Sequence, residues 1–527
     1  MPTFSLLEEP WIPVRRLDGE AVELSWREVY RQAADLADVE VESPLTYSAL
    51  MRLLVVGLYA ALRDEVTQAN RAAWWATGWP QPAVEAYFDQ WAERFDLFDE
   101  AAPFFQDPGF EFKQPSTPAG LAPELASGNN RVLFDHRVDG DAPPVRAAAA
   151  ARWLLTHQLF SLGGGNGPIS PRYGKHPNLR TAPAALGVTV FVQGETLGQT
   201  LLLNLAPRRT QAEPLGQPIW ECAFPAPRKH TVSGLLGRLT WPNRTVRLVT
   251  DATSTDAVVT GIYTAQCTDW PVTSPVGDPY FAWRLTTKGE PIPLRVTTGR
   301  ALWRDSSALF GISGQDAARA EGAKPQRPWV LAQAGVLYDL LDRAGRAPEA
   351  EWTLVAVGMA SDQSKIELWR HEELPVPTRL LLGDEGAGAL AVIDDAVQQA
   401  ERVFDALRTA TRALAAELVK PGSTAPGADD KADPKQVGSR VAAWNIDAAY
   451  WGQLDAPFRA LLAGLDKAET ALTAWRAVLE RAADDAYAQA SALAGLDPRA
   501  LRAVTLGRQA VTRSWRFRPK KPKKGSS

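Results

Sequence analysis

Residues 389–418 read ALAVIDDAVQQAERVFDALRTATRALAAEL, and nothing earlier in the chain has this character. Alanine, leucine, glutamate and arginine dominate the stretch, and its apolar residues recur at the spacing of an amphipathic helix. The change in composition begins sharply at Gly383, after a long region of strand-like and loop-like sequence. We therefore expect a separate helical domain to begin at Gly383.

Four stretches of this kind follow one another. They lie near residues 385–419, 437–463, 465–494 and 498–514. Gly464 and Asp497-Pro498 separate the later stretches, and proline is favourable in the first turn of a helix. Short joins between amphipathic helices are typical of an antiparallel bundle. The sequence thus predicts a C-terminal four-helix bundle over 383–515, followed by a basic disordered tail over 516–527.

The region before Gly383 combines both kinds of secondary structure. Apolar spacing predicts helices between Leu45 and Phe98 and over Ala147–Phe160. A β-like stretch from Val188 to Leu205 and further β-rich segments up to Leu382 predict strands. We therefore expect an α+β protein, in which a large mixed α/β domain over 1–382 precedes the helical bundle.

Composition excludes several classes of protein. A chain of 527 residues is long enough for more than one domain. Its two cysteines, Cys222 and Cys267, exclude a disulfide scaffold and a cysteine-rich zinc site. The N-terminus lacks a signal-peptide pattern, and a transmembrane run of about 18 apolar residues is missing. We therefore expect a cytoplasmic protein with no membrane partner, no cofactor and no metal.

Charge is unevenly distributed along the chain. The net charge of −4 argues against a free-standing nucleic-acid-binding protein, which usually carries a basic surface. Residues 129–209, however, hold nine basic and four acidic residues, a local net charge of +5. This segregation is compatible with an anionic partner that binds only one region of the chain.

The basic region contains the run Ser161-Leu162-Gly163-Gly164-Gly165-Asn166-Gly167-Pro168. Glycine has no Cβ, so such a run reaches positive φ and lets a ligand touch the main chain. The run is not a Walker A motif, because the nearby Gly174-Lys175 is followed by His176. Two interpretations stay open: an ordinary linker, or a loop that presents bare N–H and C=O groups to a nucleic-acid groove.

A hairpin tip is predicted at Ala360–Lys365, directly after the apolar strand Leu354–Val357, with Asp362, Gln363 and Ser364 at its centre. An amide side chain at such a tip can contact base edges or wedge a base pair apart. The alternative is a solvated turn without a ligand.

A third segment mixes amides, a cation and an aromatic ring. Its residues are Asn129, Asn130, Arg131 and Phe134. RNA-binding loops use such residues to stack on bases and to bond base edges. The alternative is an exposed loop with a buried phenylalanine. The acidic residues and histidine that follow match no strong metal-binding spacing, which favours a charged loop: Asp135, His136, Asp139 and Asp141.

Taken together, these segments resemble the large subunit of the type I-E CRISPR surveillance complex Cascade, a family often called CasA. The resemblance runs from residue 6 into the C-terminal bundle and rests on the joint order of short motifs. These motifs are Leu6–Val14, Phe160–Gly167, Val188–Gly194, Thr200–Asn204, Gly234–Pro242 and Asp362–His371.

The resemblance implies a non-catalytic subunit that recognises the protospacer-adjacent motif in double-stranded DNA, largely from the minor groove. Such a subunit helps to open the duplex for guide-RNA pairing and supports recruitment of a helicase–nuclease. Its partners would be the other Cascade subunits, the CRISPR RNA (crRNA) and the target duplex. The implied sites are a glycine loop at Gly163, Gly164, Gly165 and Asn166, a wedge at Gln363 flanked by Asp362 and Ser364, and a crRNA-handle loop at Asn129, Asn130, Arg131 and Phe134.

One departure concerns motif preference. The family often carries a lysine finger after a Tyr-Thr segment, whereas Tyr263–Trp270 contains no lysine here. Either the preferred motif differs, or a residue such as Gln266 or Thr268 takes the place of the lysine. Two other functions also stay open: a structural scaffold that does not read DNA, and a metal-dependent nuclease or hydrolase that uses the loop at 135–141.

Overall fold

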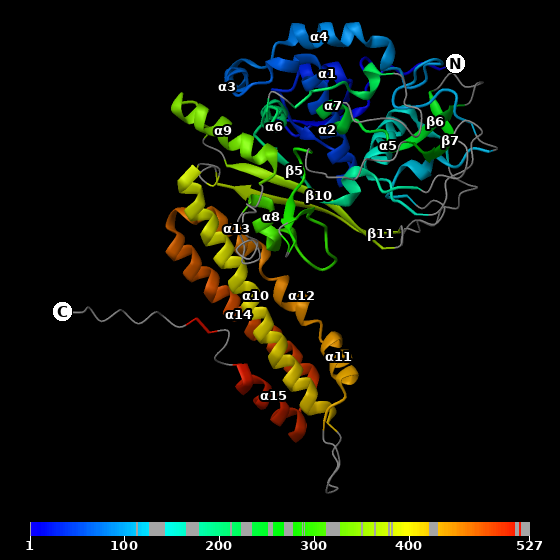
Figure 1. Cartoon of the computed structure of the whole chain (residues 1–527). Helices are drawn as coiled ribbons and strands as arrows, with labels where there is room; N and C mark the ends of the chain where they lie inside the picture. Colours follow the sequence, from blue (N-terminus) through cyan, green and yellow to red (C-terminus); the bar gives the residue numbers. More distant parts are fainter. Residues whose placement is uncertain are drawn as a thin grey trace. The chain divides into compact units, whose positions relative to one another are not determined.

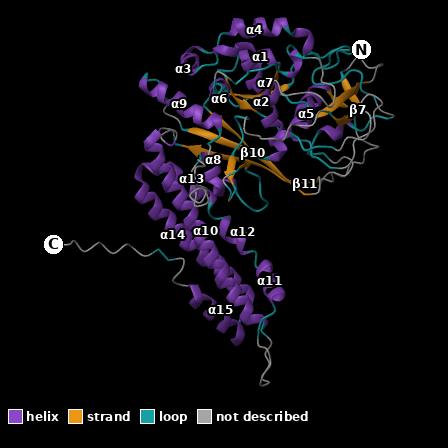
Figure 2. Ribbon diagram, viewed as in Figure 1, coloured by secondary structure: helices purple, strands orange, loops and turns teal. Residues whose placement is uncertain are grey.

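A computed structural model of the chain divides into two units, Met1–Leu382 and Gly383–Ser527 (Figure 1). The structure describes residues 2–111, 114–125, 143–164, 179–210, 213–222, 234–250, 257–267, 278–286, 288, 290–311, 327–348, 351–362, 365–377, 380, 383–420, 431–511 and 516–517. Within those residues, the strands all belong to the first unit, and the second unit is helical (Figure 2). The α+β class expected from the sequence is therefore confirmed.

The first unit mixes helices and strands along the chain. Its described helices are α1 Trp26–Arg31, α2 Pro44–Leu62, α3 Gln68–Thr77, α4 Gln81–Gln90, α5 Ala147–Phe160, α6 Leu197–Asn204, α7 Gly234–Leu239, α8 Ser306–Phe310 and α9 Trp329–Arg343. Its described strands are β1 Ile12–Arg16, β2 Ala21–Leu24, β3 Leu36–Val39, β4 Val145–Arg146, β5 Thr189–Gln193, β6 Arg244–Thr250, β7 Val258–Gln266, β8 Trp283–Leu285, β9 Pro291–Pro293, β10 Trp352–Asp362 and β11 Lys365–Val376.

Helix α2 is the central helix of the first unit. Nearly all its side chains are buried, and α4, α5, α6, α7 and strand β10 pack around it. The helix is long and apolar enough to cross a membrane, but 94% of its most apolar window is buried inside the fold. A helix that is apolar all round is typical of a core position as well as of a membrane span.

The described strands form small antiparallel sheets with the orders β2-β1-β3, β11-β10-β5, β4-β7-β6 and β8-β9. In the third sheet, β7 is the middle strand, and the short β4 leads directly into α5. Val145 pairs with Val259 near the start of β7, whereas Gln158 near the end of α5 bonds to Arg244 at the start of β6. Helix α5 therefore runs along this sheet and ends beside the first residue of β6.

The expected β-like stretch from Val188 to Leu205 is only partly correct. Strand β5 ends at Gln193, and α6 follows at Leu197. Thr196 caps the N-terminus of α6, because its Oγ1 accepts a hydrogen bond from the N–H of Gln199 (3.1 Å). A threonine cap satisfies an otherwise unbonded amide and so favours helix over strand. The apolar run after it is buried as a helix rather than as a strand.

The second unit is built on two long helices, α10 Gly383–Val419 and α14 Ala468–Ala494, which pack side by side (Figure 1). The other helices are α11 Pro434–Ala443, α12 Ile446–Trp451, α13 Asp455–Ala463 and α15 Pro498–Val511. Aromatic side chains fill the interior, and two of them bond to carbonyls of α10. Tyr450 donates to Ala400 O and Trp475 donates to Ala396 O, both at 3.0 Å.

Two expectations for this unit need correction. The stretch 437–463 lies in three helices rather than one. Asn445 adopts a left-handed conformation (φ 47°, ψ 43°) that separates α11 from α12, and a second break separates Trp451 from Asp455. The tail expected to be disordered from residue 516 begins with two bound residues. Arg516 forms ion pairs with Glu480 (3.0 Å) and Asp484 (2.6 Å) on α14, and the N–H of Phe517 donates to Glu480.

Candidate functional site

The glycine run leaves the end of α5, and its two described flanks are fastened together. The N–H of Gly164 donates to the carbonyl of Leu179 (3.0 Å), and the N–H of Ala182 donates to the carbonyl of Ser161 (2.8 Å). Residues 165–178, which include Gly165 and Asn166, lie outside the described residues. We call residues 161–182 the glycine segment, and its paired flanks, 161–164 and 179–182, the neck.

Gly163 and Gly164, the two described glycines of the run, occupy positions in the neck that favour a residue without a Cβ. The N–H of Gly163 donates to Thr181 Oγ1 (3.1 Å), and a Cβ added at Gly163 would lie 2.7 Å from the backbone nitrogen of Thr181. Gly164 has a φ of 127°, a region that favours glycine. Because both N–H groups are bonded within the chain, neither can donate to a ligand unless the neck opens.

A buried arginine binds both sides of the neck. Arg244, the first residue of β6, donates from Nη2 to the carbonyl of Leu162 (2.7 Å) and from Nη1 to the carbonyl of Arg180 (2.9 Å). Leu162 belongs to the outgoing flank and Arg180 to the returning flank. The planar guanidinium therefore holds the two flanks at a fixed separation.

Gln266, the last residue of β7, joins this arrangement. Its Oε1 accepts from the N–H of Arg180 (2.7 Å) and from Nη1 of Arg244 (2.8 Å). Its Nε2 donates to the carbonyl of Asn243 (3.0 Å). The register of β6 and β7 places Gln266 directly opposite Arg244. This cross-strand pair attaches the neck to the sheet.

Two further amide side chains join this arrangement, Gln158 at the backbone of Arg244 and Asn243 at the neck. Gln158 Oε1 accepts from the backbone N–H of Arg244 (2.8 Å), and Gln158 Nε2 donates to its carbonyl (2.9 Å). Asn243 Nδ2 donates to Ser161 Oγ (2.8 Å). We call Gln158, Asn243, Arg244 and Gln266 the polar network; these residues are between 0% and 3% exposed.

The polar network contains a buried positive charge. Burial lowers the pKa of Arg244 to about 10, so its guanidinium stays protonated at neutral pH. In the described part of the chain, this cation bonds to uncharged oxygen atoms. Burial, and to a smaller extent Arg244, lower the pKa of the neighbouring His157 to about 3. A buried cation without a carboxylate depends on well-formed hydrogen bonds, which favours a single geometry for the network.

This geometry corrects one expectation about the missing lysine finger. Gln266 is 1% exposed, and both ends of its amide are bonded inside the polar network. Its side chain cannot reach into a DNA groove without breaking the neck. Thr268, the other alternative, lies outside the described residues.

The expected hairpin is present in β10 and β11. Their pairing runs from Trp352 opposite Val376 to Asp362 opposite Lys365, with a register shift between Ala360 and Ser361. Asp362 is exposed at the end of β10. Gln363 and Ser364 connect the two strands and lie outside the described residues, so their role as a wedge stays a prediction.

The other predicted sites also fall outside the part that the structure describes. This holds for the crRNA-handle residues Asn129, Asn130, Arg131 and Phe134, and for Asp135, His136, Asp139 and Asp141. Among the described residues, His, Cys, Asp and Glu side chains form no group of three or more that could hold a metal ion.

Comparison with known proteins places the chain in a family. A model of the family described as CRISPR-associated protein Cse1 matches residues 5–486. The chain is also 32% identical over 520 residues to CRISPR-associated protein CasA/Cse1 of Thermus thermophilus, covering 97% of each protein. The chain belongs to the Cse1 (CasA) family.

Solved structures share the Cse1 fold with this chain. The structure of Thermus thermophilus CasA has a TM-score of 0.79 and 28% identity, covering 98% of this chain and 99% of that one. A chain from the structure named "CRISPR RNA-guided surveillance complex" has a TM-score of 0.75 and 23% identity, covering 97% of this chain and 100% of that one. At that identity the second likeness concerns the fold alone.

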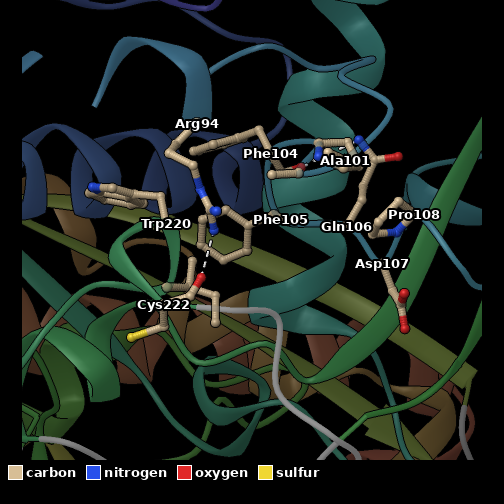
Figure 3. Close-up of a pocket in the computed structure, with 12 residues that line it drawn as sticks. Arg94, Ala101, Phe104, Phe105, Gln106, Asp107, Pro108, Trp220 and Cys222 are labelled. Carbon is tan, nitrogen blue, oxygen red and sulfur yellow. Dashed lines mark hydrogen bonds between the residues drawn. The ribbon is translucent and has the colours of Figure 1, made fainter. Parts of the chain in front are cut away.

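A cavity in this Cse1 protein lies beside the strand that carries Arg244. It has a volume of about 270 Å³, and its walls include Phe104, Phe105 and Trp220 (Figure 3). Arg94 Nη2 donates to the carbonyl of Cys222 across it (2.6 Å). The adjacent loop docks on β6, because Gln106 Oε1 accepts from Leu248 N–H (2.7 Å) and Asp107 N–H donates to Val246 O (2.9 Å). The cavity thus marks where the loop after α4 supports β6.

The polar network is the part of the site that sequence reasoning missed. In the sequence, Arg244 looks like an ordinary residue at the start of a strand, and Gln158 looks like one polar position on an apolar helix. Gln266 stands out only as a possible substitute for the missing lysine. A weak signal was present: Asn243 and Arg244 are polar residues directly after Trp241-Pro242, at the start of an apolar strand. Pattern alone does not tell which distant backbone groups such residues bind.

Proposed function

We propose that this Cse1 protein is a subunit of an RNA-guided surveillance complex and recognises the protospacer-adjacent motif in double-stranded DNA. In this proposal the glycine segment enters the minor groove, and the subunit helps to separate the strands for guide-RNA pairing. Its partners are the other subunits and the crRNA, which contacts the loop at Asn129–Phe134. It performs no bond cleavage itself and supports recruitment of the helicase–nuclease that does.

The neck is the observation that carries the proposal. A linker needs no fixed base, whereas the glycine segment is held at both flanks by the polar network and by hydrogen bonds within the neck. Ordering a segment costs conformational entropy, so a fixed base lowers the cost of presenting the segment to a ligand. This arrangement favours a binding loop over a simple connection.

The chemistry of the minor groove suits such a segment. The groove is about 6 Å wide, and a backbone without Cβ atoms enters it where larger side chains would clash. Its pattern of donors and acceptors is degenerate, since it mainly distinguishes A·T from G·C pairs. We therefore expect a relaxed preference among flanking sequences rather than a strict one.

The hairpin supports the second part of the proposal. The paired strands β10 and β11 form a long antiparallel ladder that ends at Asp362 and Lys365, the described residues on either side of Gln363 and Ser364, and β10 is also paired with β5. Inserting a side chain into a duplex unstacks a step at a cost of a few kcal/mol, which guide pairing and protein contacts then offset. Because the ladder makes the hairpin rigid, less of the binding free energy is lost to bending of the protein when the tip inserts.

The test is binding of target duplex by the complex assembled with and without this chain. Targets share one protospacer and differ in the flanking trinucleotide, at one salt concentration, because phosphate contacts make affinity salt-dependent. We expect flank-dependent binding that disappears without the chain. Binding that is indifferent to both the flank and the chain would reject the proposal and favour a scaffold.

A further inference from the structure

We propose that Arg244 and Gln266 are positioning residues that make discrimination among flanking sequences depend on the polar network. They do not contact DNA. Instead, they fix the neck of the glycine segment to the ends of β6 and β7, so the segment meets the duplex in one orientation. This inference rests on the function proposed above and adds to it the residues that set its specificity.

Arg244 and Gln266 connect both flanks of the neck to the sheet. Arg244 bonds to Leu162 on one flank of the neck and to Arg180 on the other. Gln266 bonds to Arg180 and to Arg244 through one oxygen atom. Moving the returning flank therefore requires breaking bonds to both strands, and moving the outgoing flank requires breaking its bond to Arg244, so the neck and the strand ends form a single mechanical unit.

The residue after Gln266 is attached to the same network. β7 ends at this residue, and the N–H of Cys267 donates to the carbonyl of Asn243 (3.3 Å). The same asparagine bonds to Ser161 Oγ in the neck (2.8 Å). The chain that leaves β7 and the chain that leaves α5 thus begin from the same group of bonded atoms. A displacement of the chain where it leaves β7 therefore also displaces the chain where it leaves α5.

Because Arg244 and Gln266 are buried, a positioning role can be distinguished from direct contact with DNA. Arg244 is 2% exposed and Gln266 is 1% exposed, so neither side chain can touch a phosphate or a base edge. A residue that neutralises a phosphate contributes to the salt dependence of binding, and removing it lowers the slope by about one. Substitutions at Arg244 should therefore change sequence preference without changing the salt slope.

Arg71 offers a matched control. It is 0% exposed, it donates to the carbonyls of Leu202 (2.8 Å) and Leu203 (3.1 Å), and burial lowers its pKa to about 10, as for Arg244. It lies in the same unit but bonds to the end of α6 rather than to the neck. Arg71→Lys and Arg244→Lys both keep the charge and lose the planar fork.

The experiment compares complexes carrying the wild-type chain, Arg244→Lys, Gln266→Leu or Arg71→Lys. The readouts are thermal stability, amide exchange at Gly164, the salt slope, and the ratio of target affinities between the best and the worst flank. We expect both lysine variants to lower stability. Only Arg244→Lys and Gln266→Leu should lower the affinity ratio and speed exchange at Gly164. The ratio should fall by at least about fivefold, the factor for one lost hydrogen bond, and Gln266→Leu removes three such bonds.

Gln266→Glu keeps an acceptor for Arg180 and Arg244, replaces the donor to Asn243 by an oxygen and adds a negative charge beside the Arg244 cation. Because the two bonds to the neck and to Arg244 survive, it should retain more of the affinity ratio than Gln266→Leu. If Arg244→Lys does not fold, the comparison of Gln266→Glu with Gln266→Leu still tests the inference. The inference is overturned if Arg244→Lys and Gln266→Leu keep the wild-type ratio, or if Arg71→Lys lowers it equally. A wild-type complex without flank preference would instead reject the proposed function itself.

Discussion

Arg52 on α2 and Asp278 form an ion pair inside the first unit, with side chains 4% and 1% exposed. Arg52 Nε also donates to the carbonyl of Leu239 at the end of α7 (3.2 Å), and its guanidinium lies 5.6 Å from the ring centre of Tyr280. One cation thus joins the central helix to two other segments. Removing its carboxylate would leave a buried charge without its counterion.

Asp278→Asn should therefore lower the free energy of unfolding by about 3 kcal/mol, within the usual range for breaking a buried ion pair. Urea unfolding of the full chain measures the loss. Asp64→Asn is the matched control, because Asp64 is 84% exposed and pairs with Arg208 (2.6 Å) at the surface. Surface pairs contribute little, so the control should unfold near the wild-type midpoint. Equal losses would show that burial of the Arg52 pair is unimportant.

Asp38 should make stability depend on pH. Burial raises its pKa to about 6, despite hydrogen bonds from Val39, Tyr47 and Gln193. The unfolded chain releases this proton at about pH 4. Between these values the folded chain binds more protons. The contribution of Asp38 to the free energy of unfolding is therefore full below about pH 4 and is lost as the pH rises through 6.

Asp38→Asn removes this titration. The free energy of unfolding of the variant, relative to wild type, should rise by roughly 2 to 3 kcal/mol between pH 4 and pH 7. Urea unfolding at a series of pH values measures the difference. Glu40→Gln is the control, since Asp38 and Glu40 line one cavity but Glu40 is half-exposed and pairs with Arg15 (2.9 Å). A flat difference for Asp38→Asn would contradict the raised pKa.

Two glycines of the second unit should respond in opposite directions to alanine. A Cβ at Gly507 on α15 would lie against the hydroxyl of Tyr487 and 3.0 Å from the carbonyl of Ala410. Overpacking of this kind costs about 1–3 kcal/mol. Gly388 on α10 has no atom within 4 Å of an added Cβ, so Gly388→Ala should stabilise the helix by about 0.5–1 kcal/mol. Amide exchange across α10 and α15 in the full chain reports both changes. Destabilisation by both variants would refute the packing argument.

The sequence predicted those elements whose pattern is local. The apolar stretch Ala147–Phe160 is the helix α5, and α10 begins at Gly383, where the composition changes. The errors arose where a single residue overrides a pattern. Thr196 starts a helix inside an apparent strand region, and Asn445 breaks an apparent long helix. The cap at Thr196 depends on a side-chain hydrogen bond and the break at Asn445 on a backbone conformation, and hydrophobic periodicity contains neither.

The glycine segment was visible from composition, because a run of glycines is rare and has few uses. Its support was not visible. Gln158 and Arg244 are 86 residues apart, and Gln266 lies 22 residues beyond Arg244. Only the packing of α5 along the sheet β4-β7-β6 brings their polar atoms together. Sequence reasoning thus located the loop that we propose binds DNA, but not the residues that hold its base.

The hairpin tip gives a kinetic prediction. Gln363→Ala should leave initial capture of the target duplex nearly unchanged and slow the opening of the duplex, because capture precedes insertion of the wedge. A fluorescent base beside the flanking motif measures opening, and a filter-binding assay measures capture. Gln90→Ala removes an exposed glutamine from the end of α4 and serves as the control. Opening at the wild-type rate would reject the wedge.

The neck gives the last prediction. In Gly163→Ala, the new Cβ would lie 2.7 Å from the nitrogen and 2.8 Å from Oγ1 of Thr181, so the two flanks must separate. Capture of target duplex should weaken, and the amide of Gly164 should exchange faster, because its bond to Leu179 is lost. Thr181→Val removes the Oγ1 acceptor without adding bulk between the flanks, so its effect should be smaller. If Gly163→Ala speeds exchange but binds target like wild type, the neck opens without consequence, and the geometry of the glycine segment does not determine how this protein holds DNA.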